Sequence, residues 1–389
     1  MKICLVSPYD YSHPGGVSEH VRHLAGELRD RDHRVFVMAP STELDDDNGI
    51  PDYIRIGRSV PVPGNGSVAR IALSFHLARR VRGILDEHAF DVVHYHEPLS
   101  PALPITTLRF HRGANVGTFH AYARRNLGYY YARPFLKRYF KRLHSCIAVS
   151  VPARDFVARY FPGDYHIVPN GIDTARFRPG GEPIPELRTP GWHTLLFVGR
   201  LEQRKGLPTL LEAYAELRRR RPNVRLVVVG DGPGRWGYEK FVESEAIPDV
   251  LFMGHVDAAL LPRCYASADV FCAPAVGRES FGIVLLEAMA SGVPVLASAI
   301  QGFSQVVTHG QTGQLVATGD STAWTVALER ILSDAPERQR LAAAGLRHAQ
   351  RYDWSRIVDM VLDVYSEARH RARHHLVAAG VHEQVPGLG

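Results

Sequence analysis

The stretch from Gly277 to Val295 places two glutamates, Glu279 and Glu287, eight residues apart on either side of a glycine and an apolar run. Eight residues exceed two helical turns, so we expect a helix to begin between them, with Glu279 at its mouth and Glu287 further along. The first N–H groups of a helix lack partners within it and lie at its positive end, which favours an anion. Two carboxylates beside an anion site suit a sugar carried on a diphosphate.

A cluster of cations precedes this stretch in the chain. The run Gly199-Arg200-Leu201-Glu202-Gln203-Arg204-Lys205-Gly206 follows an apolar segment and places three cations within six residues. At the carboxyl end of a strand such side chains would neutralise a diphosphate, and arginine adds bidentate geometry. The alternative is a solvated basic loop that holds no ligand.

Two features of the first half also point to a ligand. Pro14-Gly15-Gly16-Val17 follows the first apolar run and opens a helix pattern, so the backbone there could approach a phosphate, although a tight turn explains the glycines equally well. His120 ends the apolar run that begins at Asn115, which predicts a polar role beside the substrate.

The histidines of His94-Tyr95-His96-Glu97 alternate along a predicted strand rather than sharing a helix face, and no third ligand has suitable spacing. We therefore expect no metal there. The four cysteines form no CxxC pair, and most lie in strand-like runs, which favours buried free thiols in a reducing compartment.

The elements that must position these residues are strands and helices that alternate regularly along the chain. At 389 residues, with 45% hydrophobic and 22% charged, the chain suits two globular domains. Apolar runs alternate with helix patterns, which predicts α/β domains with doubly wound parallel sheets whose ligands bind outside the carboxyl ends of the strands, in the cleft between the domains. We expect domains at 1–169 and 170–353, with a last helix at about 354–374 that caps the second domain or crosses back to the first.

The expected strands are Ile3–Ser7, Val35–Ala39, Val92–His96, Val116–His120, Cys146–Ser150, Thr194–Gly199, Val224–Gly230, Val250–Met253, Val270–Ala273 and Val293–Ala297. The expected helices include Val17–Asp30, Ser67–His88, Pro208–Arg221 and Thr322–Leu332.

Residues 124–142 carry seven cations and no acid, interleaved with aromatic and aliphatic side chains. This mixture suits a surface that touches anionic lipid headgroups, and Arg79, Arg80 and Arg82 would extend it. A helix with a buried aromatic face and a solvated basic face fits as well. No nucleic-acid recognition module accompanies the segment, so we expect no nucleic-acid partner.

These motifs together resemble the GT4 family of retaining glycosyltransferases, which have the GT-B fold of two Rossmann-like domains facing across a cleft. The resemblance covers nearly the whole chain through Gly15-Gly16, the Arg200–Gly206 loop and the pair of glutamates at 279 and 287. Segments such as Pro8-Tyr9, residues 65–70 and 352–355 resemble more closely its phosphatidyl-myo-inositol mannosyltransferase branch, which moves mannose from GDP-mannose to the inositol of phosphatidylinositol.

The resemblance implies a role for each matching residue. The first domain would bind the acceptor and the second the nucleotide-sugar donor. Glu279 would bind the sugar hydroxyls, Glu287 the ribose, and His120 would lie beside the reacting sugar. The implied catalytic residues are His120, Arg200, Lys205 and Glu279. The implied donor-binding residues are Gly16, Arg200, Arg204, Lys205, Glu279, Ser280, Phe281, Gly282, Ile283 and Glu287. The implied acceptor-binding residues are Tyr9, Asn65, Ser67, Arg70 and Arg125.

The sequence departs from the family at Gly64, where an aromatic residue is usual, at Arg125, where a lysine is usual, and in a shorter phosphate loop. These departures bear on the acceptor more than on the donor. Alternatives are a UDP-sugar transferase acting on diacylglycerol or a polysaccharide, a sugar-nucleotide epimerase, and a non-catalytic sugar-nucleotide or membrane-binding module. A dinucleotide-dependent oxidoreductase shares the fold class but its fingerprint is absent.

We expect no tightly bound cofactor, a nucleotide sugar such as GDP-mannose as co-substrate, and no requirement for a divalent metal. No stretch reaches the roughly 18 apolar residues of a membrane span, so the expected location is cytoplasmic and peripheral, on the inner face of the cell membrane. The sequence does not predict the oligomeric state.

Overall fold

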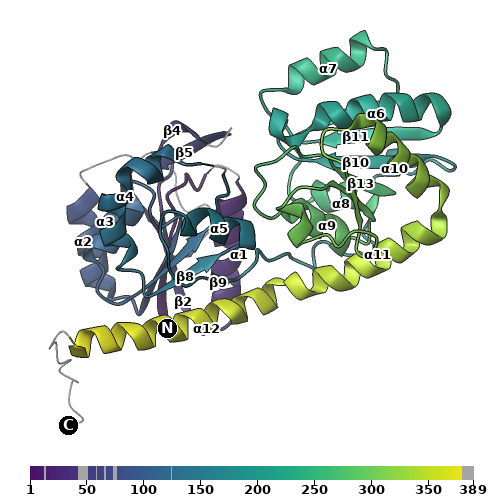
Figure 1. Ribbon diagram of the computed structural model, residues 1–389. Coiled ribbons are helices and arrows are strands. Elements are labelled where there is room, and N and C mark those ends of the chain that lie inside the picture. The colour runs from purple at the N-terminus through teal and green to yellow at the C-terminus, as the bar shows by residue number, and fades with distance from the viewer. Residues whose placement is uncertain are drawn as a thin grey trace. The chain divides into compact units, whose positions relative to one another are not determined.

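The computed structural model describes residues 1–12, 15–42, 51–57, 59–64, 67–72, 77–123 and 125–378. The chain divides into two compact units, Met1–Pro169 together with the segment that starts at Ser355, and Asn170–Trp354. The sequence places the first boundary between residues 169 and 170, and the chain divides there. Figure 1 shows the elements of each unit.

The first unit contains a seven-stranded parallel sheet in the order β3-β2-β1-β6-β7-β8-β9. Its central strands are buried on both faces, which explains why they are continuous apolar runs rather than alternating ones. In β1, for example, Ile3, Cys4, Leu5 and Val6 are all fully buried. The strands are β1 (Lys2–Val6), β2 (Arg34–Ala39), β3 (Tyr53–Arg55), β6 (Val92–His96), β7 (Ala114–Phe119), β8 (Ser145–Ala148) and β9 (His166–Ile167).

The helices of the first unit each bury one face. In α1, the buried residues Ser18, Val21, Leu24, Ala25 and Leu28 recur at helical spacing. The helices are α1 (Gly16–Arg29), α2 (Leu77–His88), α3 (Leu103–Phe110), α4 (Leu127–Phe140), α5 (Val151–Ala158) and α12 (Trp354–Ala378).

The last helix, α12, returns to the first unit, which the sequence left open. The hydroxyl of Tyr365 on α12 lies 2.8 Å from Nδ1 of His94 on β6, and both side chains are fully buried. A buried hydrogen bond between two polar side chains far apart in sequence requires the two elements to pack together. Helix α12, drawn in yellow in Figure 1, is therefore part of the first unit's core from Ser355 onward.

The predicted helix Ser67–His88 is wrong in its first half. Residues Ser59–Gly64 (β4) and Ser67–Ala72 (β5) form an antiparallel hairpin, and helix α2 begins only at Leu77. Val68 and Ile71 are β-branched residues, which suit a strand once a partner is available. That partner is β4, and its pairing overrides the helix pattern.

The second unit contains a six-stranded parallel sheet in the order β12-β11-β10-β13-β14-β15. Both sheets therefore have the doubly wound order in which the first strand lies next to the fourth. The strands are β10 (His193–Val198), β11 (Val224–Val229), β12 (Val250–Gly254), β13 (Val270–Ala273), β14 (Val295–Ser298) and β15 (Gln314–Val316). The helices are α6 (Leu207–Arg220), α7 (Arg235–Ser244), α8 (Leu260–Ala266), α9 (Ile283–Ala290), α10 (Ser321–Ser333) and α11 (Ala335–Ala349).

The strand order singles out one place at the carboxyl edge of each sheet. Ligands of doubly wound sheets bind where the connections leave two neighbouring strands in opposite directions. In the first unit this place lies beyond β1 and β6, and in the second beyond β10 and β13. The loops after these four strands contain Gly15–Gly16, Glu97, Arg200–Gly206 and Glu279.

All four cysteines are free and buried, as the sequence predicts. Within the described part of the chain, none of the helices combines the length and the apolar character that crossing a bilayer requires.

Candidate functional site

The loop after β10 and the segment after β13 lie against each other in the second unit. The backbone N–H of Val276 donates to the carbonyl of Arg204 at 2.9 Å. Gly206 has φ +71°, and a Cβ there would lie 1.9 Å from the carbonyl oxygen of Pro274. Only glycine allows this approach, so the cationic loop is fixed on the segment that leads to Glu279.

Glu279 forms ion pairs with two of the predicted cations. Its Oε1 lies 2.5 Å from the guanidinium of Arg204 and 2.7 Å from Nζ of Lys205. The three side chains are mostly buried, with 21%, 18% and 12% of Arg204, Lys205 and Glu279 exposed. Partial burial strengthens this pairing relative to a surface ion pair. The structure thus brings together a carboxylate and two cations that are far apart in sequence, 75 residues in the case of Arg204.

Arg200 reaches the same group through Glu202, a residue that sequence reasoning missed. Glu202 is 5% exposed and holds Nε of Arg204 at 2.8 Å and Nε of Arg200 at 3.1 Å, while Arg200 itself is 54% exposed. The sequence shows Glu202 only as one acid among cations. Its burial between two arginines makes it the residue that positions both of them. The group contains three cations and two carboxylates, so it has one excess positive charge, which favours the binding of an anion.

Helix α9 begins at Ile283, four residues after Glu279, with Glu287 in its second turn, as the spacing predicts. Gly282, at φ +99°, caps the helix, and a Cβ there would lie 2.8 Å from the ring of Phe303. Ser280 and Ile283 are half-buried. Phe281 is 3% exposed and belongs to the core, so it can meet a ligand only through its backbone.

Glu287 is held by a neighbour that the sequence did not indicate. The hydroxyl of the fully buried Tyr265 donates to Glu287 Oε2 at 2.7 Å. The nearby carboxylate and burial raise the pKa of Tyr265 well above its usual value, with burial as the larger cause. Tyr265 therefore stays a hydrogen-bond donor and fixes the direction of the Glu287 carboxylate.

A glycine-rich loop after β11 completes this edge and was also missed. A Cβ on Gly230 would lie 2.0 Å from the carbonyl oxygen of Gly199, and one on Gly232 would lie 2.8 Å from the backbone of Leu201. Both glycines are needed for the close approach to the cationic loop. The sequence signal was present in Gly230-Asp231-Gly232-Pro233-Gly234, directly after a predicted strand.

In the first unit, Gly16 stands at the first position of α1, after Gly15 at the N-cap. A Cβ built on Gly16 meets no atom of the described residues within 4 Å, and its φ is not in the left-handed region. The chain's own packing therefore does not require glycine here. A ligand approaching the backbone at the start of α1 would require it.

His120 lies in a group of three histidines. Its Nε2 is 3.0 Å from Nδ1 of His96, and its ring packs edge-on against His20 of α1 with centroids 4.9 Å apart. Burial, followed by the charges of His20 and His94, lowers the pKa of His120 well below its usual value. A neutral His120 at pH 7 can donate or accept a hydrogen bond to a substrate hydroxyl.

Glu97 fixes the backbone that carries His120. Its Oε1 accepts the N–H groups of His120 at 2.7 Å and Ala121 at 2.8 Å. Glu97 itself has φ +54°. Burial raises its pKa, while the two N–H bonds act in the opposite direction. In the sequence, Glu97 belongs to the segment His94-Tyr95-His96-Glu97, where we expect no metal, and the structure makes it a positioning residue for the loop after β7.

His94 does not act as a metal ligand in this arrangement. Its two ring nitrogens lie 2.8 Å from the Tyr365 hydroxyl and 2.6 Å from Oγ1 of Thr118. Among the described residues, the histidines whose nitrogens lie close enough to share an ion are instead His20, His96 and His120, within 4.8 Å of one another. Two of these three are hydrogen-bonded to each other.

The predicted acceptor residues are only partly described. Asn65 lies outside the described residues. Ser67 and Arg70 lie on β5, where the structure describes the backbone but not the side chains. Tyr9 is half-buried, and burial and then Glu97 raise its pKa, so its hydroxyl stays protonated. Arg125 is exposed. Of the five residues, Tyr9 is the one that the structure places beside Glu97.

The basic segment forms α4, and several of its apolar side chains are exposed while others pack in the core. Leu127, Tyr130, Tyr131 and Phe135 are 67%, 66%, 76% and 50% exposed, beside exposed Arg133, Lys137 and Arg138. Leu136 and Tyr139 are the buried residues of this helix. The alternative of a buried aromatic face therefore holds in part. Tyr129, Tyr139 and Phe140 pack in the core of the first unit, whereas Tyr130, Tyr131 and Phe135 are exposed.

Comparisons with known proteins agree with this architecture. Residues 14–176 match the family model described as Glycosyltransferase Family 4, and residues 187–348 match the model described as Glycosyl transferases group 1. The phosphatidyl-myo-inositol mannosyltransferase of Mycobacterium leprae (strain TN) is 38% identical over 372 residues, covering 94% of this chain and 96% of its own length.

The phosphatidyl-myo-inositol mannosyltransferase of Propionibacterium freudenreichii subsp. shermanii is 34% identical over 385 residues, covering 95% of each chain. Among solved structures, the crystal structure of Anabaena Alr3699/HepE in complex with UDP has a TM-score of 0.77 at 21% identity. That match covers 94% of this chain and 100% of the other, and it shows a shared fold.

Proposed function

The chain belongs to the Family 4, group 1 glycosyltransferases of the GT-B fold, and from this premise we propose that it transfers mannose from GDP-mannose to the inositol of phosphatidyl-myo-inositol. The observation that carries the donor half of this proposal is the group formed by Arg204, Lys205 and Glu279 beside the start of α9. The relatives at 38% and 34% identity, both phosphatidyl-myo-inositol mannosyltransferases by name, support the sugar and the acceptor.

In the proposed reaction the bond between the anomeric carbon and the diphosphate oxygen breaks, and a bond from that carbon to an inositol oxygen forms on the same face. The inositol hydroxyl proton passes to the departing diphosphate, so the anomeric configuration is retained and no further reactant is needed. The main task of the protein is to stabilise negative charge on the leaving diphosphate. Arg200, Arg204, Lys205 and the N-terminus of α9 supply that stabilisation through this chain's own groups.

Glu279 has two states in this proposal. Without a donor it pairs with Arg204 and Lys205, as in the structure. When the diphosphate arrives, the cations take phosphate oxygens as partners and the carboxylate becomes free to accept sugar hydroxyls. Glu287, held by Tyr265, is proposed to bind the ribose.

The first unit is proposed to supply the acceptor side. Tyr9 with Asn65, Ser67, Arg70 and Arg125 would bind the inositol phosphate, and neutral His120 would bond to the reacting sugar. The exposed apolar and basic side chains of α4 are proposed to rest on an anionic membrane at its cytoplasmic face, because both kinds of side chain favour the interfacial region.

The test offers GDP-mannose, UDP-glucose and UDP-GlcNAc separately to the purified protein, with vesicles that contain or lack phosphatidylinositol. Nucleotide release and lipid product are both followed. The proposal expects release and product with GDP-mannose only when phosphatidylinositol is present. Turnover of a UDP-sugar with another acceptor, or donor binding without turnover, would overturn it.

A further inference from the structure

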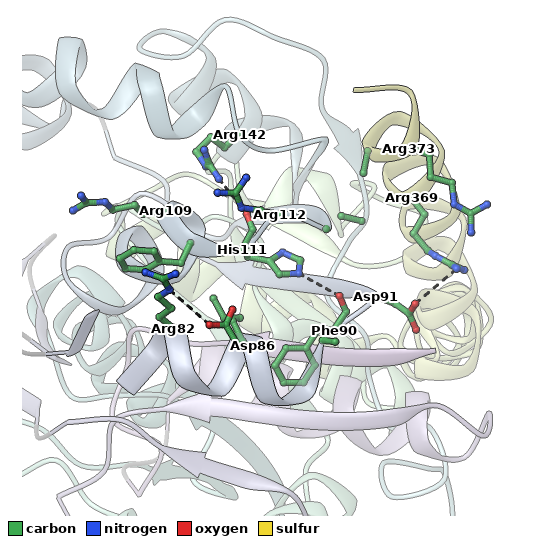
Figure 2. Close-up of a pocket in the computed structure, with 16 residues that line it drawn as sticks. Arg82, Asp86, Phe90, Asp91, Arg109, His111, Arg112, Arg142, Arg369 and Arg373 are labelled. Atoms are coloured by element: carbon green, nitrogen blue, oxygen red, sulfur yellow. Dashed lines mark hydrogen bonds and ion pairs between the residues drawn. The ribbon is translucent and has the colours of Figure 1, made fainter. Parts of the chain in front are cut away.

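A second charged pocket lies at the opposite edge of the first unit's sheet (Figure 2). It has a volume of about 750 Å³ and opens among α2, the loop between α3 and β7, and α12. Six arginines line it. They are Arg82, Arg109, Arg112, Arg142, Arg369 and Arg373.

The pocket is distinct from the proposed active site, because it lies at the amino ends of the strands. Asp91 and Gly113, which line it, directly precede β6 and β7. The other ends of these two strands carry His96 and lead to His120. Strands of five and six residues at about 3.3 Å per residue span roughly 16–20 Å, so one small ligand cannot touch both edges.

The two acids of the pocket do not neutralise it. Arg82 lies 3.7 Å from Asp86, with both side chains largely exposed, and Arg369 lies 3.9 Å from Asp91, with 35% and 41% of these side chains exposed; both distances are long. Such pairs are weak. Asp91 also accepts the backbone N–H of Lys2 at 2.8 Å. Six permanent positive charges therefore face two carboxylates, an excess of four.

The remaining arginines have no carboxylate partner among the described residues. Arg112 and Arg373 are exposed and come from different elements, the loop before β7 and helix α12. Arg109 contacts the ring of Phe110, with its guanidinium carbon 5.4 Å from the centroid. Figure 2 shows Arg369 and Arg373 on α12, across from Arg82 and Arg109. Like charges gathered around one cavity repel one another unless an anion lies between them.

One arginine is already fixed for binding. Arg142 donates to the carbonyl of Leu108 at 2.7 Å and to that of His111 at 3.1 Å. His111 forms the buried floor, with its ring nitrogens 2.8 Å from Asn115 Oδ1 and 3.2 Å from the carbonyl of Phe90. A cation held in place before the ligand arrives loses less conformational freedom on binding.

We propose that this pocket binds a soluble anion carrying two or more phosphate groups, at a site separate from the glycosyl-transfer centre. The volume suits a small ligand, and the guanidinium groups offer paired N–H donors that match phosphate oxygens. A lipid headgroup site would carry exposed apolar side chains at its rim. The large exposed apolar side chains of the first unit's described residues are Met360 on α12 and, on α4, Leu127, Tyr130, Tyr131 and Phe135, and none of them lines the pocket.

The test titrates inorganic tripolyphosphate into the full-length protein by calorimetry. Lys205→Ala serves as the background, because it weakens the proposed donor site. In that background we expect a separate site, whose affinity falls about tenfold or more when Arg112→Gln and Arg373→Gln are added together. Arg356→Gln, an exposed arginine on the same helix α12 but outside the pocket, is the matched control and should leave the affinity unchanged.

Three results would overturn the proposal. The first is an unchanged affinity in the double variant, and the second is equal weakening by Arg356→Gln. The third is co-sedimentation with anionic vesicles that depends on Arg112 and Arg373, without any tripolyphosphate binding, which would indicate a lipid headgroup. Thermal unfolding of each variant without ligand shows whether it is folded. Because the titration measures binding and not transfer, its failure leaves the proposed function untouched.

Discussion

Lys205 Nζ lies 2.7 Å from Oε1 of Glu279, and the guanidinium of Arg204 lies 2.5 Å from the same oxygen. A single carboxylate oxygen thus holds two of the three cations that the proposed mechanism assigns to the leaving diphosphate. In the free protein, the Glu279 carboxylate partly neutralises the charge of these cations and holds their side chains close together. A donor must compete with it for them.

This competition gives a prediction for Glu279→Gln. The amide no longer holds the cations by charge, so we expect GDP to bind as tightly as in wild type or more tightly. Turnover should fall about 100-fold or more, because the sugar loses its carboxylate acceptor. Calorimetry with GDP and steady-state transfer rates measure the two effects. If Glu279 only complements the helix dipole, worth under about 1 kcal/mol, turnover would change little.

Gly16→Ala separates a ligand role from a packing role. The added Cβ meets no atom within 4 Å in the described part of the chain, so the variant should fold and be as stable as wild type. Replacing glycine by alanine in a helix can even stabilise by about 0.5–1 kcal/mol. If the donor diphosphate approaches the backbone there, kcat/KM should fall at least tenfold while the unfolding midpoint is unchanged.

Gly206→Ala is the contrasting variant, because its Cβ would collide with the carbonyl of Pro274 at φ +71°. It should lose stability by more than the roughly 1–3 kcal/mol of backbone strain alone. Full activity in Gly16→Ala would remove Gly16 from the donor site.

Because His94 is buried, we expect the folded protein to lose stability in mild acid. Burial lowers its pKa from 6.5 to about 3, so between these values the unfolded chain binds a proton that the folded protein does not. Stability therefore falls as pH drops from 6.5 toward 3, by about 1.4 kcal/mol per pH unit for this side chain. The raised pKa of Glu97 has the opposite effect, but it is present in every variant compared.

His94→Gln should make the acid side of the stability profile shallower, as measured by urea unfolding between pH 7 and pH 5. The variant loses the hydrogen bond to Tyr365, so its stability at pH 7 will be lower and only the slope is compared. His255→Gln, at an exposed position, is the control. Equal slopes in wild type and His94→Gln would contradict the account.

Because helix α4 exposes apolar and basic side chains, we expect the protein to bind anionic vesicles through it. Tyr131 and Phe135 are 76% and 50% exposed, and replacing both with serine removes apolar area that would enter the interface. We expect flotation with phosphatidylinositol vesicles to fall several-fold in Tyr131→Ser/Phe135→Ser. Trp236→Ser, which removes a side chain 73% exposed in the second unit, should float like wild type. Equal loss in both variants would mean that α4 has no special role.

Much of the fold could be predicted because buried parallel strands are continuous apolar runs. Predicted strands such as Val92–His96 and Val270–Ala273 coincide with β6 and β13, and the motifs that end them lie at the carboxyl edge. The hairpin β4–β5 could not be predicted from Ser67–Ala72 alone. Its strand conformation depends on pairing with β4, which is a tertiary effect.

The site was predictable where residues of special type cluster in sequence, as in Arg200–Lys205 and around Glu279. Glu202 and Tyr265 were missed because their roles come from burial and from partners distant in sequence. The arginine pocket was missed for the same reason. Arg82 and Arg373 are far apart in the chain and meet only when α12 packs back on the first unit.

The most direct test of the central claim follows radiolabelled mannose from GDP-mannose into phosphatidylinositol, with wild type and Lys205→Ala side by side. We expect a labelled lipid with retained anomeric configuration in wild type. In Lys205→Ala we expect a loss of about 3–4 kcal/mol in transition-state stabilisation, a drop of roughly 100- to 1,000-fold in kcat/KM. Arg219→Ala, an arginine on α6 that is 75% exposed, should act like wild type. No labelled lipid in wild type, or near-wild-type transfer by Lys205→Ala, would contradict the account.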